Sequence, residues 1–139
     1  MQTNRQDINR MYLSFLGKLT LITLFTVVMY LGFIFLFPEL PVPSKSISIF
    51  IVLFGVTAGI HYILLRAGRG EAQKLANFII LSIVIKLFLY AVFTFLLILS
   101  DRDGAMSNVV MFFVVYIIYT VFEITSMYLQ VNQMNDSQK

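Results

Sequence analysis

Residues 75–99 read LANFIILSIVIKLFLYAVFTFLLIL, and eighteen of these residues are Leu, Ile, Val or Phe. A helix rises about 1.5 Å per residue, so about 20 residues cross the roughly 30 Å hydrocarbon core of a bilayer. The stretch is long enough to cross, and it lacks the apolar and polar alternation of a membrane β-strand. Three further apolar runs, 19–37, 47–65 and 108–131, are near or above that length. The sequence therefore predicts an all-α membrane protein with four transmembrane helices.

The composition of the whole chain agrees with this fold class. Its 139 residues are 59 % hydrophobic and 12 % charged, whereas about 25 % of residues are charged in ordinary soluble domains. The runs leave too little polar sequence for a soluble catalytic domain. We expect residues 1–139 to form a single transmembrane domain, with 1–18 as a cytoplasmic or interfacial lead-in or an extension of the first helix. With no cysteine and one histidine, thiolate sites and histidine clusters are excluded, and we expect no metal and no cofactor.

The connections between the runs differ in positive charge. The N-terminal segment and the second connection hold six basic residues: Arg5, Arg10, Lys18, Arg66, Arg69 and Lys74. The first and third connections hold one each, Lys45 and Arg102. Because cytoplasmic connections are rich in Lys and Arg, we expect both termini to be cytoplasmic, with the four spans arranged as two antiparallel hairpins. Arg66, Arg69 and Lys74 then form a cytoplasmic basic anchor that fixes topology or contacts a partner.

The third run carries a polar stripe at intervals of four, which aligns its members on one helical face. They are Ser82, Lys86, Tyr90 and Thr94. From a cytoplasmic start at residue 75, Lys86 lies about 16 Å deep, near the middle of the membrane. A lysine there costs roughly 2.5–3.5 kcal/mol on insertion scales, so the charge needs a partner.

The fourth run supplies such a partner. Glu123 lies about 12 Å from the cytoplasmic end of this run, within one helical turn of the depth of Lys86. A short connection favours neighbouring antiparallel helices, so we predict a buried contact between Lys86 and Glu123. Further polar residues share this face of the fourth run: Tyr116, Tyr119, Thr120 and Ser126.

Three interpretations of the Lys86–Glu123 pair stay open. It could only hold the two helices in register, since matched polar groups join helices in a membrane. It could engage an ionisable group of another membrane protein, because intramembrane charges commonly mark functional contacts. Proton or ion conduction is the third interpretation, and it is weakly supported because one acid and one lysine do not make a relay.

The second run contains a GxxxG pattern and the only histidine. Gly55 and Gly59 lie four residues apart, which allows another helix to approach closely and predicts a helix-packing face. His61 stands near the inner end of this run, and with no second histidine or cysteine we interpret it as an interfacial anchor rather than a metal ligand.

Two segments resemble a known family. The stretch IKLFLY at 85–90, followed by FFVVYIIYTVFE at 112–123, is similar to the ATP synthase protein I group, small four-helix membrane proteins beside bacterial F-type ATP synthase. The resemblance covers the second half of the chain and the four-span plan. It implies a bacterial inner membrane as the location and a non-enzymatic accessory protein that helps to assemble or stabilise the ring of c subunits, with ATP synthase membrane subunits as partners. A role in magnesium supply has also been proposed for the group.

The resemblance gives the two charged residues a physical role to test. The c subunits are helical hairpins with a buried carboxylate, which is costly to leave in lipid before the ring closes. Lys86 would hold that carboxylate, Glu123 would be its resting counter-ion, and the Gly55–Gly59 face would be a docking surface.

Other function classes are weaker. A homo-oligomer, in which two copies provide two Glu123 carboxylates, is the minimum design for a Mg²⁺ transporter, since Mg²⁺ prefers octahedral oxygen coordination. Export of a lipid-linked substrate is a further alternative. We expect no enzyme, because the hydroxyl groups of the spans have no histidine at comparable depth. The net charge is +3, and the basic residues are concentrated in the connections where the membrane topology requires them. We therefore expect the lipid bilayer, and no nucleic acid, as a partner.

Overall fold

The computed structural model describes residues 5–67 and 72–136, with side-chain surroundings for all of these except 5, 7, 72–76, 131 and 133–136. Over these ranges the chain forms helices and no strand. The helices are α1 (Arg5–Leu36), α2 (Ser46–Ala67), α3 (Ala72–Ser100) and α4 (Ala105–Asp136). The all-helical prediction is confirmed for this part of the chain.

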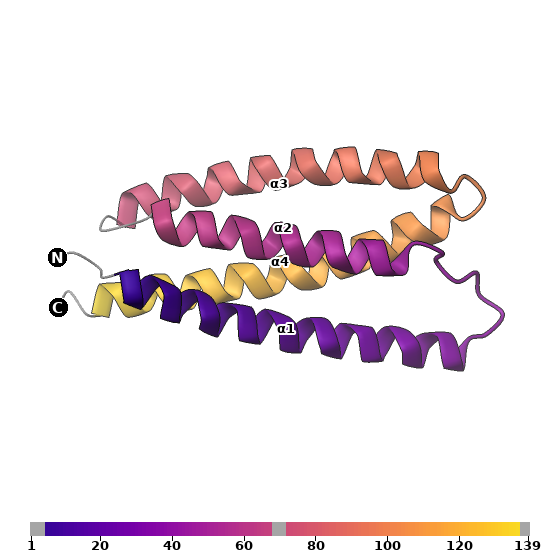
Figure 1. Cartoon of the computed structure of the whole chain (residues 1–139), viewed down its shortest axis with the longest axis horizontal. Coiled ribbons are helices and arrows are strands. Elements are labelled where there is room, and N and C mark those ends of the chain that lie inside the picture. Colours follow the sequence, from indigo (N-terminus) through magenta and orange to yellow (C-terminus); the bar gives the residue numbers. More distant parts are fainter. Residues whose placement is uncertain (1–4, 68–71, 137–139) are drawn as a thin grey trace.

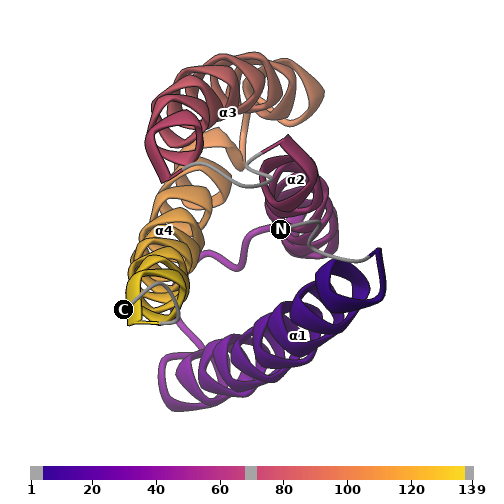
Figure 2. The same cartoon turned by 90° about the vertical axis from the view of Figure 1, so that its left-hand side faces the viewer.

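The helices lie side by side along their length. The start of α1 and the end of α4 lie at one end of the molecule, and the α1–α2 and α3–α4 connections lie at the other (Figure 1). Seen from the end, α2 and α4 lie between α1 and α3 (Figure 2). The contacts agree, because α2 and α4 touch each other and both outer helices. The outer helix α3 therefore packs on the chain from one side only.

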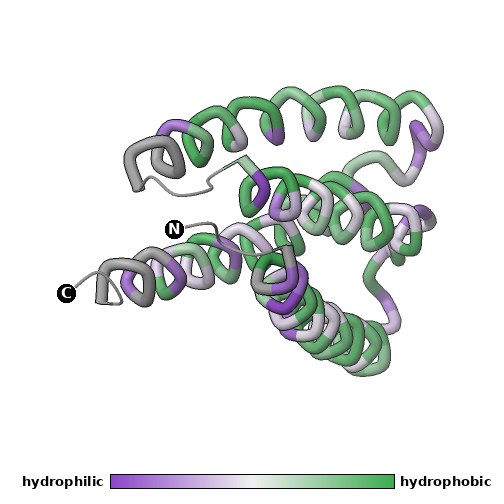
Figure 3. The backbone as a smooth tube through the Cα atoms, turned by 60° about the vertical axis from the view of Figure 1, so that its left-hand side comes forward, coloured by the Kyte–Doolittle hydropathy of each residue, from purple (hydrophilic) through white to green (hydrophobic). Residues whose placement is uncertain are grey.

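All four helices are long and apolar enough to cross a membrane. The candidate spans are Ile8–Leu36, Ser46–Ala67, Asn77–Ser100 and Ala105–Gln130. Hydrophobic residues cover most of the middle of each helix (Figure 3), and many large apolar side chains are more than half exposed, such as Leu87 at 66 % and Phe88 at 69 %. A surface of this kind fits lipid rather than water.

The first helix is longer than the predicted run at 19–37. It continues without a break from Arg5 to Leu36, because nothing in the lead-in interrupts helical hydrogen bonding and its apolar residues repeat at helical spacing. The alternative that the lead-in lengthens the first helix is therefore the one that the structure adopts. Its depth in the membrane stays a prediction.

The core where the helices meet is narrow and mostly aromatic or aliphatic. Its buried members include Phe15, Leu19, Ile49, Leu53, Tyr90, Leu97, Phe112, Val115 and Tyr119. Lipid is as apolar as these side chains, so their burial alone does not drive helix association in a membrane. Close packing and polar contacts between helices hold such a bundle together, and these contacts define the candidate site.

Candidate functional site: a buried ion pair between α3 and α4

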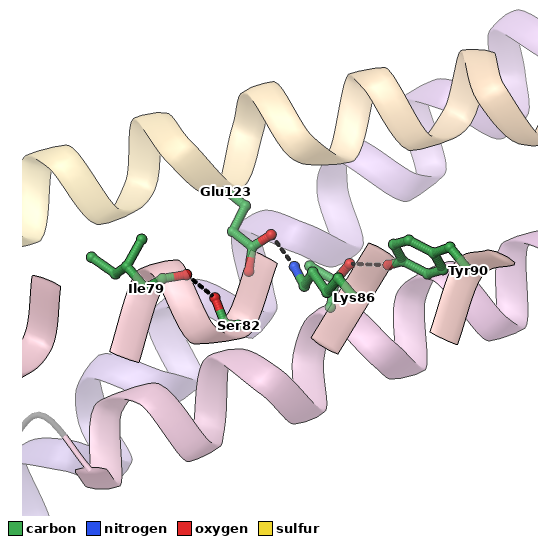
Figure 4. Close-up of polar contacts among 6 residues, drawn as sticks. Ile79, Ser82, Lys86, Tyr90 and Glu123 are labelled. Carbon is green, nitrogen blue, oxygen red and sulfur yellow. Dashed lines mark hydrogen bonds and ion pairs between the residues drawn. The ribbon is translucent and has the colours of Figure 1, made fainter. Parts of the chain in front are cut away.

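Lys86 and Glu123 form an ion pair across the α3–α4 contact (Figure 4). Each side chain is 9 % exposed, so the pair lies inside the bundle. The contact expected from the matched depths of the two residues is present. In a buried pair, removing one partner leaves an uncompensated charge, which typically costs about 3–5 kcal/mol.

The pair does not use all of its hydrogen-bonding capacity. Glu123 accepts from Lys86 through Oε2, while Oε1 is buried and has no partner among the described protein atoms. A lysine ammonium carries three donors, and the contact with Glu123 accounts for one of them. Oε1 of Glu123 is therefore a buried acceptor that no described protein group uses.

The polar stripe of α3 does not converge on Lys86. Ser82, one turn before it, donates to the carbonyl of Ile79 at 2.7 Å, and Tyr90, one turn after it, meets Thr57 of α2 at 3.5 Å (Figure 4). Thr94 is half-buried at the far end of the stripe. The stripe thus joins α3 to two neighbours, with Tyr90 turned to α2 and Lys86 to α4.

The polar face of α4 also divides between neighbours. Tyr119 is buried, and its hydroxyl lies 2.6 Å from the hydroxyl of Thr23 on α1. Tyr116 is half-buried with its ring edge-on to Tyr90, and Thr120 is half-buried. Of the predicted α4 residues that the structure describes, Glu123 is the one with a hydrogen bond or ion pair to Lys86. The tyrosines contribute packing and a link to α1.

His61 was expected to act as an interfacial anchor, but its side chain is packed inside the bundle and does not reach the surface. The residue is 0 % exposed, with its ring stacked on Phe15 at a centroid distance of 3.4 Å. Neither ring nitrogen has a partner among the described protein atoms. The imidazole packs against the aromatic face of Phe15 on α1. The sequence of α2 alone could not indicate this contact between helices.

The two glycines of the GxxxG pattern lie on the outside of α2. Both are exposed, and a Cβ added to either Gly55 or Gly59 would meet nothing within 4 Å. No helix of the same chain packs on this face in the described residues. The packing role of the two glycines therefore stays a prediction for contacts between chains.

The basic anchor is described only in part. Arg66 is exposed in the last turn of α2. Arg69 lies outside the described residues. Lys74 belongs to α3 by its backbone, and its side chain lies outside the described surroundings.

A second polar cluster, which the sequence analysis missed, ties the two connections together. The Asp101 carboxylate accepts from the Ser44 hydroxyl, from the Gly104 amide at 3.0 Å and from the Asn108 amide group at 3.0 Å. The Lys45 amide in turn donates to Asn108 Oδ1 at 3.1 Å. The hydrogen bond from Ser44, with those from Gly104 and Asn108, lowers the pKa of Asp101 from its usual value of 3.8. Only the spatial meeting of two loops reveals this cluster.

Comparison with known proteins adds no family assignment. No protein-family model, curated protein or solved structure matches the chain. Among the described residues, no three His, Cys, Asp or Glu side chains gather as a group that could hold a metal ion.

Proposed function

We propose that the chain is a non-enzymatic integral membrane accessory protein that assists assembly or stability of the F-type ATP synthase membrane sector, the c-subunit ring in particular. The resemblance of 85–90 and 112–123 to the ATP synthase protein I group supplies the partner. The buried Lys86–Glu123 pair, with its unused hydrogen-bonding capacity, is the observation that supports a role for these residues.

In this proposal the four helices form two antiparallel hairpins in a bacterial inner membrane, with both termini in the cytoplasm. Two observations support the orientation. The start of α1 and the end of α4 lie together (Figure 1). The last turn of α2, which carries Arg66, lies at that same end as the start of α1 (Figure 1), and the positive-inside rule assigns an end with basic residues to the cytoplasm.

The outer position of α3 makes Lys86 reachable by a partner. On either side of Lys86, Ile85 is 45 % exposed and Leu87 is 66 % exposed, so a partner helix that packs along α3 lies beside the lysine. The Lys86 side chain is 9 % exposed and turned to α4, so its flexible stem has to turn outward for Nζ to meet a partner carboxylate at the same depth. The ammonium has two donors besides the one that Glu123 accepts, and these are available to that carboxylate.

The test is c-ring assembly in cells whose ring depends on this protein. Lys86→Met keeps the helix apolar, so the protein still inserts, and we expect the amount of assembled ring on native gels to fall. The control is Lys86→Met combined with Glu123→Met, which removes the unpaired carboxylate and restores the bundle. A double variant that fails like the single variant supports partner binding by Lys86. A double variant that assembles rings like the wild type would refute it.

The second candidate is a dimeric transporter of a cation or of a lipid-linked substrate. The observation that favours a dimer is the open face of α2, where Gly55 and Gly59 leave room for a second helix. A dimer would bring two Glu123 carboxylates into one assembly. Mg²⁺ flux into proteoliposomes that is abolished by Glu123→Gln would support this candidate over the assembly role.

A further inference from the structure

A second polar site lies at the other side of the bundle, where the start of α1 meets the end of α4. A pocket of about 500 Å³ opens between the two helices. Its polar lining comes from Arg10, Ser14 and Lys18 of α1 and from Ser126 and Gln130 of α4. Pockets of roughly 300–1,000 Å³ are typical of sites that bind small molecules or parts of lipids.

The spacing of the lining residues makes the pocket polar along both walls. Arg10, Ser14 and Lys18 follow one another at intervals of four, as do Ser126 and Gln130, so each set lines one helical face. The described lining residues include two cations and no carboxylate. Two positive charges beside hydroxyl and amide groups provide the charge-assisted hydrogen bonds that phosphate oxygens accept.

The apolar part of the pocket points to a lipid. Phe15 is 2 % exposed and forms part of the lining together with Met11 and Leu129. Leu129 is itself 52 % exposed, so the apolar side of the pocket continues onto the outer surface of the bundle. A free phosphate would make no favourable contact with this apolar wall, whereas the first carbons of an acyl chain would pack against it.

The depth of the pocket matches the inner headgroup layer. Counted from Leu36, the outer end of the first span, Lys18 lies about 27 Å along the helix, near the far boundary of a roughly 30 Å core. Counted from Ala105, Ser126 lies about 32 Å along α4. Both helices thus independently place the pocket where hydrocarbon gives way to headgroups, with Arg10 and Gln130 farther out.

We propose that this pocket binds the phosphate group of an anionic phospholipid of the inner leaflet. Arg10 and Lys18 contact the phosphate, Ser14 and Ser126 donate hydrogen bonds to its oxygens, and the apolar wall takes the start of an acyl chain. The bound lipid fills the space between α1 and α4, which contact each other less than any other neighbouring pair. The assignment to the inner leaflet rests on the orientation in the proposed function, whereas the binding test does not depend on Lys86 or on the proposed partner.

The experiment is native mass spectrometry of the full chain in mild detergent, titrated with phosphatidylglycerol, with phosphatidylcholine, or with phosphatidylglycerol in the presence of inorganic phosphate. We expect the first phosphatidylglycerol to bind more tightly than phosphatidylcholine. Near an anionic lipid each cation contributes about a fivefold change in affinity, so Arg10→Gln with Lys18→Gln should weaken the first phosphatidylglycerol about thirtyfold.

Two further variants separate the pocket from charge in general. Lys45→Gln with Arg102→Gln removes the same number of charges from the connections at the other end of the bundle, outside the pocket lining, and it should bind phosphatidylglycerol like the wild type. Ser126→Leu fills the pocket without changing charge and should lower binding, with circular dichroism confirming an intact helical fold. Equal binding of the two lipids, or equal loss in both charge variants, would overturn the proposal. Displacement of the lipid by inorganic phosphate would assign the pocket to a free phosphate instead.

Discussion

Replacing Lys86 by methionine should destabilise the bundle far more than replacing both members of the ion pair. In the wild type, Glu123 uses one carboxylate oxygen for Lys86 and has no described partner for the other. Lys86→Met therefore leaves a buried carboxylate with neither oxygen partnered, at a cost of about 3–5 kcal/mol. A loss of about 4 kcal/mol lowers the folding equilibrium constant roughly a thousandfold, a large part of the 5–15 kcal/mol that stabilises a typical protein.

The double variant, with Glu123→Met added, should recover most of that loss, because two apolar side chains of similar length replace a pair whose desolvation was costly. The assay is reversible unfolding in mixed micelles with increasing denaturing detergent, followed by circular dichroism for the wild type, both single variants and the double variant. A single-variant loss below about 1 kcal/mol, with no recovery in the double variant, would show that the two side chains are not coupled in the folded protein.

Three further predictions concern other contacts of the bundle. Folding depresses the pKa of Asp101 below its unfolded value, so its contribution to stability is present above about pH 3.8 and is lost as the pH falls through the lower folded value; acid titration of the wild type against Asp101→Asn should show this dependence in the wild type alone. Tyr119→Phe removes the contact with Thr23 and should cost about 1 kcal/mol in the micelle assay, with Thr23→Ala adding little in the Tyr119→Phe background. Gly55→Ala and Gly59→Ala should each leave the monomer as stable as the wild type or more stable by up to about 1 kcal/mol, because an added Cβ meets nothing; a loss of monomer stability would contradict the open face.

The sequence predicts the helices well because each apolar run is long and strongly hydrophobic. The ends of the helices are less predictable. Hydropathy indicates which part of a helix can lie in lipid, whereas the helix itself ends where its backbone hydrogen bonds end. For this reason α1 begins at Arg5 and α4 continues to Asp136, both outside the predicted runs.

The Lys86–Glu123 contact was predictable because depth along a helix is simple arithmetic and neighbouring spans joined by a short loop face each other. Contacts that depend on rotation about the helix axis were not. His61 is buried because α1 places Phe15 against its ring, and Asp101 gains its partners because two loops meet in space. Neither relation leaves a pattern within a single segment of the chain.

The partner in the proposed function is tested most directly by affinity purification of a tagged copy from gently solubilised native membranes, followed by quantitative mass spectrometry. The account predicts enrichment of ATP synthase membrane subunits with the wild type, and loss of that enrichment with both Lys86→Met and the stable Lys86→Met/Glu123→Met double variant. Purification of a homo-oligomer without these subunits would contradict the account and favour the dimeric transporter.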